Sequence, residues 1–358
     1  MEPKRILCVF SLLNRGGAEN MCMNIYRHID RSKIQFDFVK HVDIKGDFED
    51  EIVALGGRIY HAPRFKMYNY FSYARWWRRH FQNHPEHQIV HAHFFTISPI
   101  YLRIAKRYGR TTINHIHGMT AGGGIKDFIA KRSAKVSDYK FACSELAGYW
   151  GYQSEKFEVV NNALEIREYR FDESVRLAAR EELGLSQFFV MGTVANFSAV
   201  KNPFGLIRIF EVASKLNPEA RLLWVGSGPM QNKIEEEIKK RNLAEKILLM
   251  GNRDDVPRLL QAMDVFVLPS FSEGLPVSLI EAQTAGLPCL CSDVITREVN
   301  ITGLCKFISV DDIEKWSEEC KHISATCRDT AYMEVARNGY DISETSRRLQ
   351  YFYENLEK

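Results

Sequence analysis

Two carboxylates stand eight residues apart in the stretch SEGLPVSLIEAQTAGLP, residues 272–288. Glu273 precedes Pro276, which suits the first position of a helix because its missing N–H would have no partner there, and Glu281 then falls in the second helical turn. The preceding residues 265–270, VFVLPS, are short, apolar and β-branched, as is typical of a buried parallel strand. We therefore expect both carboxylates at the carboxyl end of that strand, where open α/β sheets bind ligands.

The start of the same predicted helix offers backbone groups that suit an anion. Unpaired N–H groups around Gly274, Leu275 and Val277 could bind a phosphate. Two carboxylates beside a phosphate would repel it unless they bind hydroxyl groups instead, and a nucleotide sugar meets both conditions. The simpler alternative is that the carboxylates only complement the helix dipole, an effect of about 0.3–1 kcal/mol. The helix should run for about three turns and end at Gly286, before Pro288.

Size and composition indicate a globular chain. Its 358 residues, 45% of them hydrophobic and 26% charged, favour two domains. The apolar run near the N-terminus is short and has no cleavage site, so we interpret it as a first buried strand rather than a signal peptide. No stretch approaches the ~20 apolar residues of a membrane span. The cysteines form no CxxC pair and are interpreted as reduced core residues of a cytoplasmic protein: Cys8, Cys22, Cys143, Cys289, Cys291, Cys305, Cys320 and Cys327.

Positive charge is concentrated in the first half of the chain. Between Arg58 and Lys135 there are 14 lysines and arginines but only two acids, Glu86 and Asp127, whereas the whole chain carries a net charge of +3. Such asymmetry indicates an anionic partner for this half. Nucleic-acid-binding motifs are absent from the sequence, so we expect an anionic membrane surface and no nucleic acid.

Residues 70–82, YFSYARWWRRHFQ, would form a helix with an aromatic face and a basic face. The aromatic face would carry Tyr70, Tyr73, Ala74, Trp77 and Phe81. The basic face would carry Arg75, Arg78 and Arg79. This composition is typical of a helix that lies on an anionic membrane, with Trp77 and the three arginines in contact with it. The alternative, a surface helix whose aromatic side chains pack on its own domain, fits the pattern equally well. The local charge favours the membrane, because each basic residue adds about 1 kcal/mol near an anionic surface.

Strand-like and helix-like runs alternate along the whole chain. The strands of the first series are predicted at residues 6–10, 36–39, 89–94, 112–115, 139–143 and 157–160, and those of the second at 189–195, 221–225, 246–250, 265–268, 289–292 and 307–310. Two successive βα series predict an α/β protein with two Rossmann-like, doubly wound domains. We place these domains at residues 1–165 and 166–340, with a polar linker at 162–187. The final helix, within 341–358, should pack back on the first domain.

Glycine-rich turns follow predicted strands at residues 14–19, NRGGAE, and 226–229, GSGP. Neither turn completes a GxGxxG motif, and no acidic residue ends a second strand at the expected place. A nicotinamide-dependent dehydrogenase is therefore the poorer interpretation, and the sequence has no Walker loop either.

Four histidines form two same-face pairs on predicted strands, His91 with His93 and His115 with His117. Their spacing could suit zinc, but no cysteine or carboxylate completes either set. Packed or capping histidines, and histidines that contact a substrate at a strand end, are the alternatives.

The chain resembles family 4 of the retaining glycosyltransferases with the GT-B fold, a group that includes bacterial capsule and exopolysaccharide transferases. The likeness spans nearly the whole chain, and the Glu-x7-Glu segment is its most specific part. The matching residues are Gly16-Gly17-Ala18-Glu19, His91-Ala92-His93, His117-Gly118, Asn161-Asn162-Ala163, Lys201-Asn202, Gly226-Ser227-Gly228-Pro229, and EGLPVSLIEA with AGLP.

This resemblance implies a role for each matching position. Glu281 would bind the ribose hydroxyls of the nucleotide, and Glu273 the hydroxyls of the transferred sugar. Lys201 would hold the diphosphate, and His117 would lie against the sugar, so that Glu273, His117 and Lys201 form the catalytic set. The donor would also contact Gly16, Gly17, Asn196, Gly274, Leu275, Pro276 and Val277. Retention by front-face attack, with the leaving phosphate as base, is likewise implied by the resemblance alone.

The leaving diphosphate gains negative charge, which something positive must meet. Because no two aspartates in the chain are two residues apart, no Asp-x-Asp metal motif exists. Lys201 and helix N-termini must then stabilise that charge, so we expect no metal and no cofactor besides the nucleotide-sugar donor.

Asn196 departs from the family pattern, which often has an arginine five residues before the lysine. Loss of that arginine would remove a bidentate phosphate donor. The consequence could be a weaker donor affinity, a compensating cation elsewhere or an inactive copy.

The function that the resemblance implies is the transfer of a sugar, as a UDP-sugar, to a lipid-linked or saccharide acceptor in surface polysaccharide synthesis. The enzyme would be cytoplasmic and peripheral on the inner face of the plasma membrane. Two alternatives stay open: an epimerase or phosphorylase-like enzyme of the same two-domain build, and an inactive scaffold that binds nucleotide sugars.

Overall fold

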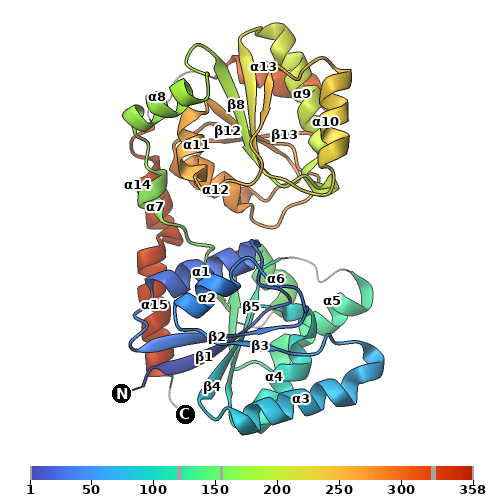
Figure 1. The fold of residues 1–358 in the computed structure, drawn as a ribbon, viewed down its shortest axis with the longest axis vertical. Coiled ribbons are helices and arrows are strands. Elements are labelled where there is room, and N and C mark those ends of the chain that lie inside the picture. Colours follow the sequence, from blue (N-terminus) through green and yellow to red (C-terminus); the bar gives the residue numbers. More distant parts are fainter. Residues whose placement is uncertain (1, 119–122, 154–155, 324–327, 357–358) are drawn as a thin grey trace. The chain divides into compact units, whose positions relative to one another are not determined.

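The computed structural model describes residues 2–118, 123–153, 156–323 and 328–356. The chain divides into two compact units, unit 1 with residues 1–164 and 339–358, and unit 2 with residues 165–338 (Figure 1). Each unit is a single parallel sheet with helices on its faces. The predicted α/β class with two Rossmann-like sheets is thereby confirmed.

The sheet of unit 1 has the strand order β3-β2-β1-β4-β5-β6-β7, and all neighbouring strands are parallel. Successive strands are added on one side of β1 up to β3, and on the other side from β4 onward. The carboxyl ends of β1 and β4 are therefore the switch point at which such sheets bind ligands. The strands are β1 Lys4–Val9, β2 Ile34–Lys40, β3 Ile59–His61, β4 His87–Ala92, β5 Thr111–Ile116, β6 Tyr139–Ala142 and β7 Glu158–Val159.

The helices of unit 1 include the C-terminal helix, which lies beside α1 (Figure 1). Tyr353 of that helix is buried against Phe36 of β2, and Lys4 Nζ donates to its carbonyl oxygen at 2.8 Å. The helices are α1 Gly17–His28, α2 Glu49–Ala54, α3 Tyr70–Asn83, α4 Ser98–Arg107, α5 Gly124–Lys131, α6 Glu145–Tyr152 and α15 Ile342–Asn355, with short turns η1 Met67–Asn69, η2 Phe95–Ile97 and η3 Arg132–Lys135.

The sheet of unit 2 has the strand order β10-β9-β8-β11-β12-β13, and its neighbouring strands are again parallel. Its switch point lies between β8 and β11. The strands are β8 Phe189–Val194, β9 Ala220–Val225, β10 Ile247–Leu249, β11 Val265–Leu268, β12 Cys289–Ser292 and β13 Cys305–Ile308. The helices are α7 Ile166–Tyr169, α8 Glu173–Glu182, α9 Pro203–Leu216, α10 Gln231–Lys240, α11 Val256–Ala262, α12 Val277–Thr284, α13 Ile313–Lys321 and α14 Ala331–Val335, with short turns η4 Ala199–Lys201 and η5 Arg297–Val299. The turn η6 Ala336–Tyr340 contains the residue at which unit 2 ends, Asn338.

The polar stretch 162–187 is not a linker, contrary to the sequence-based prediction. It contains α7 and α8, and α8 packs on α11. Arg176 and Arg180 of α8 both form ion pairs with Asp264, at the entrance to β11. Charged residues in this stretch thus hold α8 to unit 2, a pairing over long sequence distance that composition alone does not reveal.

The cysteines in the described part of the chain are free and buried. Cys327 lies outside the described residues. No described helix has both the length and the apolar content needed to cross a membrane.

Candidate functional site

The carboxyl ends of β8 and β11 bring a lysine and a glutamate together. Lys201 closes the short turn η4 after β8, and Glu273 lies on the loop after β11. Lys201 Nζ donates to Glu273 Oε1 at 2.6 Å, and the two side chains are 20% and 10% exposed. Because β8 and β11 are neighbours at the switch point, this ion pair occupies the place where the sheet of unit 2 should bind a ligand.

Helix α12 begins just beyond Glu273. Pro276 is its N-cap rather than its first residue, and the helix has eight residues, shorter than the three turns predicted. Gly286 follows the C-cap Ala285 with a left-handed backbone, φ at 68°, so the helix ends where the sequence predicted. No side chain caps the N-terminus, so the amides around Gly274, Leu275 and Val277 stay available to an anion.

Glu281 lies on α12 and is half-buried as a residue. Tyr169 of α7 donates its hydroxyl hydrogen to Glu281 Oε1 at 2.9 Å. Burial raises the pKa of Glu281, and the bond from Tyr169 opposes that shift. Sequence reasoning missed Tyr169, since it stands 112 residues before Glu281 in a stretch that we took for a linker.

Asn196 is exposed on the loop between β8 and Lys201. Its Oδ1 accepts a hydrogen bond from Ser198 Oγ at 2.7 Å. The side chain thus faces its own loop, and the cation that the family often has at this position is replaced by a neutral amide.

The glycine turn after β9 supports that loop by close packing. A Cβ at Gly226 would lie 2.1 Å from Ala195 O, and a Cβ at Gly228 would lie 2.8 Å from Phe197 N. The backbone N–H of Phe197 donates to Ser227 O at 2.9 Å. Glycine is needed at both positions because the two loops touch backbone to backbone.

In unit 1 the glycine turn after β1 leads directly into α1. Gly16 is the N-cap of this helix, no side chain caps it, and Gly17 is its first residue. A Cβ at Gly16 would lie 2.3 Å from Glu19 Oε2, so the carboxylate of Glu19 fills the space above the turn. Burial raises the pKa of Glu19. The start of α1 therefore lies beside the Glu19 carboxylate, unlike the start of α12.

His117 follows β5 and joins a group of four stacked imidazoles. His93 Nδ1 and His117 Nε2 share a hydrogen bond of 2.9 Å, and His91 Nδ1 lies 2.7 Å from the Tyr353 hydroxyl. The His91 and His93 rings are 4.2 Å apart and the His115 and His117 rings 4.1 Å apart. Burial lowers the pKa of His91 and of His117 to about 3, so both rings are neutral at physiological pH.

The same histidines bear on the zinc alternative. Nitrogen atoms of His91, His93 and His115 lie within 4.8 Å of one another. The lone pair of an imidazole lies in the plane of its ring, and these planes differ by at most 33°. Lone pairs on stacked, nearly parallel rings do not converge on one point about 2.0–2.1 Å from each nitrogen, as zinc requires. The arrangement of His91, His93 and His115 favours packing of neutral rings over coordination. Contrary to the sequence-based expectation, cysteines do lie beside a histidine of this group, since the sulfur atoms of Cys8 and Cys22 and a nitrogen of His93 are within 4.8 Å of one another.

Trp77 does not contact a membrane, contrary to the prediction. It is fully buried with Tyr73 and Phe81, because this face of α3 packs on α4 within the core of unit 1. Arg75, Arg78 and Arg79 are exposed on the opposite face, as predicted. The exposed apolar side chains lie instead at the start of the helix, where Met67, Tyr68 and Phe71 are 79%, 82% and 80% exposed.

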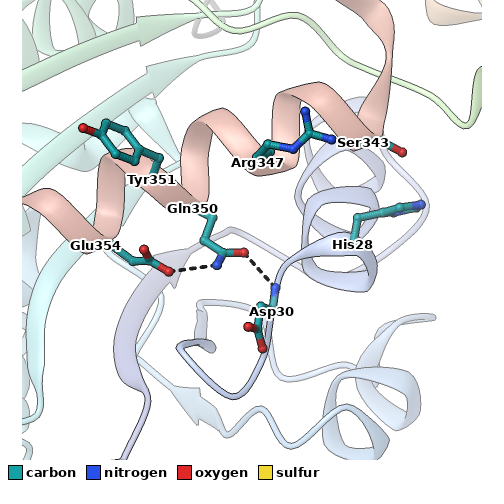
Figure 2. A pocket seen from close by; sticks show the side chains of 7 residues that line it. All are labelled: His28, Asp30, Ser343, Arg347, Gln350, Tyr351 and Glu354. Atoms are coloured by element: carbon teal, nitrogen blue, oxygen red, sulfur yellow. Dashed lines mark hydrogen bonds between the residues drawn. The ribbon is translucent and has the colours of Figure 1, made fainter.

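A separate surface pocket of about 460 Å³ lies between the end of α1 and α15 (Figure 2). Gln350 bridges its wall, since its Oε1 accepts from Asp30 N at 2.9 Å and its Nε2 donates to Glu354 Oε1 at 2.8 Å. The other lining residues are His28, Ser343, Arg347 and Tyr351. None of the predicted donor residues is among them, so this pocket is not the candidate site.

Comparisons with known proteins match both halves of the chain. The family described as Glycosyltransferase Family 4 matches residues 15–168, and the family described as Glycosyl transferases group 1 matches residues 176–323. EpsF of Bacillus subtilis (strain 168), which is named as a glycosyltransferase by assignment, is 31% identical over 362 residues, which cover 96% of this chain and 94% of EpsF. The chain belongs to family 4 of the glycosyltransferases. The resemblance inferred from its motifs is confirmed.

Two further proteins are similar to this glycosyltransferase, one in structure and one in sequence. Anabaena Alr3699/HepE, solved in complex with UDP, superposes with a TM-score of 0.80 at 17% identity, over 98% of this chain and 100% of HepE. That likeness gives the fold, GT-B. The UDP-Gal:alpha-D-GlcNAc-diphosphoundecaprenol alpha-1,3-galactosyltransferase of Escherichia coli is 34% identical over 145 residues, 39% of this chain and 37% of that protein.

Proposed function

We propose that this glycosyltransferase moves a sugar from a UDP-sugar to a lipid-linked saccharide acceptor in surface polysaccharide synthesis, with retention of the anomeric configuration and without a metal ion. The observation that carries the proposal is the Lys201–Glu273 ion pair at the switch point of unit 2, beside the uncapped start of α12. A cation, free amides and two carboxylates are the groups that a sugar diphosphate requires.

The choice of UDP rests on related proteins. HepE has been solved with UDP and with UDP-glucose, and the Escherichia coli relative is named for a UDP-Gal donor. In this chain Glu281 would take the ribose hydroxyls and Glu273 the hydroxyls of the sugar.

Lys201 and the helix N-termini would supply the positive charge of the reaction. As the bond between the anomeric carbon and the diphosphate oxygen breaks, the diphosphate gains negative charge. The Lys201 ammonium has three N–H donors, of which Glu273 takes one, so the others can bind the departing phosphate. The acceptor hydroxyl attacks from the same face and gives its proton to that phosphate. Glu273 acts by positioning the sugar, and the donor contacts that the resemblance implies for His117, Gly16 and Gly17 stay predictions.

The lipid-linked acceptor is proposed from relatives and from the surface of unit 1. The Escherichia coli protein, and a Campylobacter jejuni relative 26% identical over 149 residues, are named for acceptors attached to diphosphoundecaprenol. Such acceptors lie in a membrane. An exposed tip at the start of α3 offers apolar side chains that enter a bilayer surface, those of Met67, Tyr68 and Phe71. The helix also offers cations that bind anionic headgroups, Arg75, Arg78 and Arg79. We therefore place the enzyme in the cytoplasm, peripheral on the inner face of the plasma membrane, and assign it no nucleic-acid partner.

The test is a panel of UDP- and GDP-sugars offered with and without synthetic diphosphopolyprenyl saccharide acceptors. We expect release of UDP, acceptor-dependent product whose new linkage keeps the donor's α configuration by NMR, and an unchanged rate in EDTA. A rate that requires added magnesium or manganese would overturn the metal-free mechanism. Binding of a nucleotide sugar without transfer or hydrolysis would favour the inactive scaffold, the alternative raised by Asn196.

A further inference from the structure

Tyr169 holds the carboxylate that the proposed function assigns to the nucleotide ribose. Its hydroxyl donates to Glu281 Oε1 at 2.9 Å. Within the described part of the chain, this is the one hydrogen bond or ion pair on the Glu281 carboxylate. Tyr169 is only 8% exposed, so the bond lies away from bulk water. A partly buried carboxylate with a single donor still needs further donors.

The backbone that carries Tyr169 is fixed by another residue, Gln261 of α11, which is 2% exposed. Its Nε2 donates to Tyr169 O at 3.3 Å and to Arg170 O at 3.4 Å, and its Oε1 accepts from Asp172 N at 3.3 Å. This clamp does not involve Glu281. The Tyr169 hydroxyl is therefore in place before any ligand arrives.

The remaining capacity of Glu281 suits a pair of hydroxyl groups. An ionised carboxylate accepts about four hydrogen bonds, and Tyr169 supplies one of them. A ribose offers two neighbouring hydroxyl donors. Burial favours the neutral acid by raising the pKa of Glu281, whereas the bond from Tyr169 favours the carboxylate. The Tyr169 hydroxyl thus aims the carboxylate and opposes the effect of burial on the pKa of Glu281.

We propose that Tyr169 is a positioning residue that orients the Glu281 carboxylate, so that the site selects nucleotides with both ribose hydroxyls. This inference rests on the proposed function, because it takes Glu281 as the ribose ligand. It adds a residue from the first helix of unit 2 to the donor site.

The experiment is calorimetry of UDP binding to the wild type and to Tyr169→Phe between pH 5.5 and 8.5. We expect the variant to raise the Kd about tenfold at pH 7.5, as for loss of one hydrogen bond to a charged group. The ratio of the variant Kd to the wild-type Kd should be larger at pH 5.5, because without the Tyr169 hydroxyl a larger fraction of Glu281 is protonated. The second probe, 2′,3′-dideoxyuridine diphosphate, should bind the wild type and the variant equally, since it has no hydroxyl for Glu281 to hold.

Two comparisons separate positioning from a general structural effect. In a Glu281→Ala background, Tyr169→Phe should change the UDP affinity less than about twofold, because its partner is gone. Tyr152→Phe removes another buried tyrosine hydroxyl, in unit 1, and should leave UDP affinity unchanged. If Tyr169→Phe does not fold, Gln261→Ala is the second variant. It keeps Tyr169 and Glu281 but removes the hydrogen bonds that hold the backbone around Tyr169. It should weaken UDP binding without changing the affinity for the dideoxy probe.

The inference fails if Tyr169→Phe binds UDP like the wild type at every pH. It also fails if the variant weakens both probes equally, which would indicate a structural role. A wild type that binds none of UDP, GDP, ADP and CDP would instead contradict the proposed function, and this result needs no variant.

Discussion

Asn202 ties the loop that carries Lys201 to the end of the neighbouring strand at Pro269. Its Nδ2 donates to Pro269 O, just past β11, at 3.0 Å, and its Oδ1 accepts from Gly205 N at 3.1 Å as the N-cap of α9. The residue is buried, and its backbone adopts the left-handed conformation with φ at 52°. One side chain therefore starts a helix, joins β8 to β11 and fixes the approach of Lys201 to Glu273.

Replacing that side chain should cost stability. We expect Asn202→Ala to lower the free energy of unfolding by about 2–3 kcal/mol, because it removes an N-cap, a buried hydrogen bond and the left-handed preference of asparagine. Asn242 is the matched control, since it is also left-handed, with φ at 57°, but exposed. Asn242→Ala should cost about 1 kcal/mol. Equal losses in urea unfolding would show that the bond to Pro269 contributes nothing.

Lys201 should be hard to replace if it stabilises the leaving diphosphate. We expect Lys201→Ala to lower kcat/KM by at least ~10²-fold, the usual effect of losing one preorganised electrostatic donor. Glu273→Gln should depress kcat while sparing UDP affinity. Lys215 serves as the control, because it forms an exposed ion pair with Glu211 on α9, and Lys215→Ala should leave turnover intact. Wild-type donor affinity and turnover in Lys201→Ala would place the phosphate elsewhere.

Asn196→Arg should tighten binding of the diphosphate. The loop is exposed and can admit a longer side chain, and a guanidinium can bind phosphate through two N–H donors. We expect a Kd for UDP lower by about tenfold, as for a charge-assisted hydrogen bond. The measurement is the Kd for UDP by calorimetry, for the wild type and for Asn196→Arg. An unchanged Kd would show that position 196 does not face the diphosphate in this chain.

Unit 1 should lose stability as the pH falls below about 6.5. Burial lowers the pKa of His41 to about 4, and of His80 and His91 to about 3, from an ordinary value of 6.5. The unfolded chain therefore binds more protons than the folded chain between these pKa values. The contribution of these histidines to the free energy of unfolding is fully present above pH 6.5 and is lost as the pH falls toward 3. Each histidine can contribute up to about 1.4 kcal/mol per pH unit.

Unit 2 provides the internal control for this pH dependence, because its only histidine is His322. Urea unfolding is measured at pH 7.5, 6 and 5. As the pH falls, the urea concentration at the unfolding midpoint should decrease much more for unit 1 than for unit 2. Equal shifts of the two midpoints would mean that the buried histidines of unit 1 do not govern the acid response.

The membrane contact should depend on the tip of α3 rather than on Trp77. We expect Tyr68→Ala with Phe71→Ala to weaken sedimentation with anionic vesicles, and Arg75, Arg78 and Arg79 changed together to Glu to weaken it further. Tyr351→Ala removes an aromatic side chain of similar exposure, 69%, from α15 and should have no effect. Unchanged sedimentation of both tip variants would contradict the proposed contact.

Much of the architecture follows from local pattern. Largely apolar runs such as residues 265–268 and 289–292 coincide with β11 and β12, because strands buried on both faces are mostly apolar. The strand β3 escaped prediction, since it has three residues that are half-buried or exposed. The aromatic face of residues 70–82 was ambiguous for a physical reason: a helix face that packs on a core and one that enters a membrane have the same periodicity.

The sequence by itself determined the residue types of the site and the family that they indicate, because a turn, a helix start and an eight-residue spacing are local properties. Tertiary structure alone decided which groups meet. Lys201 reaches Glu273 only because β8 and β11 are neighbours in the sheet, and Tyr169 reaches Glu281 only because α7 packs on α12. Such contacts join residues 72 and 112 positions apart, and no local pattern encodes the packing that closes those distances.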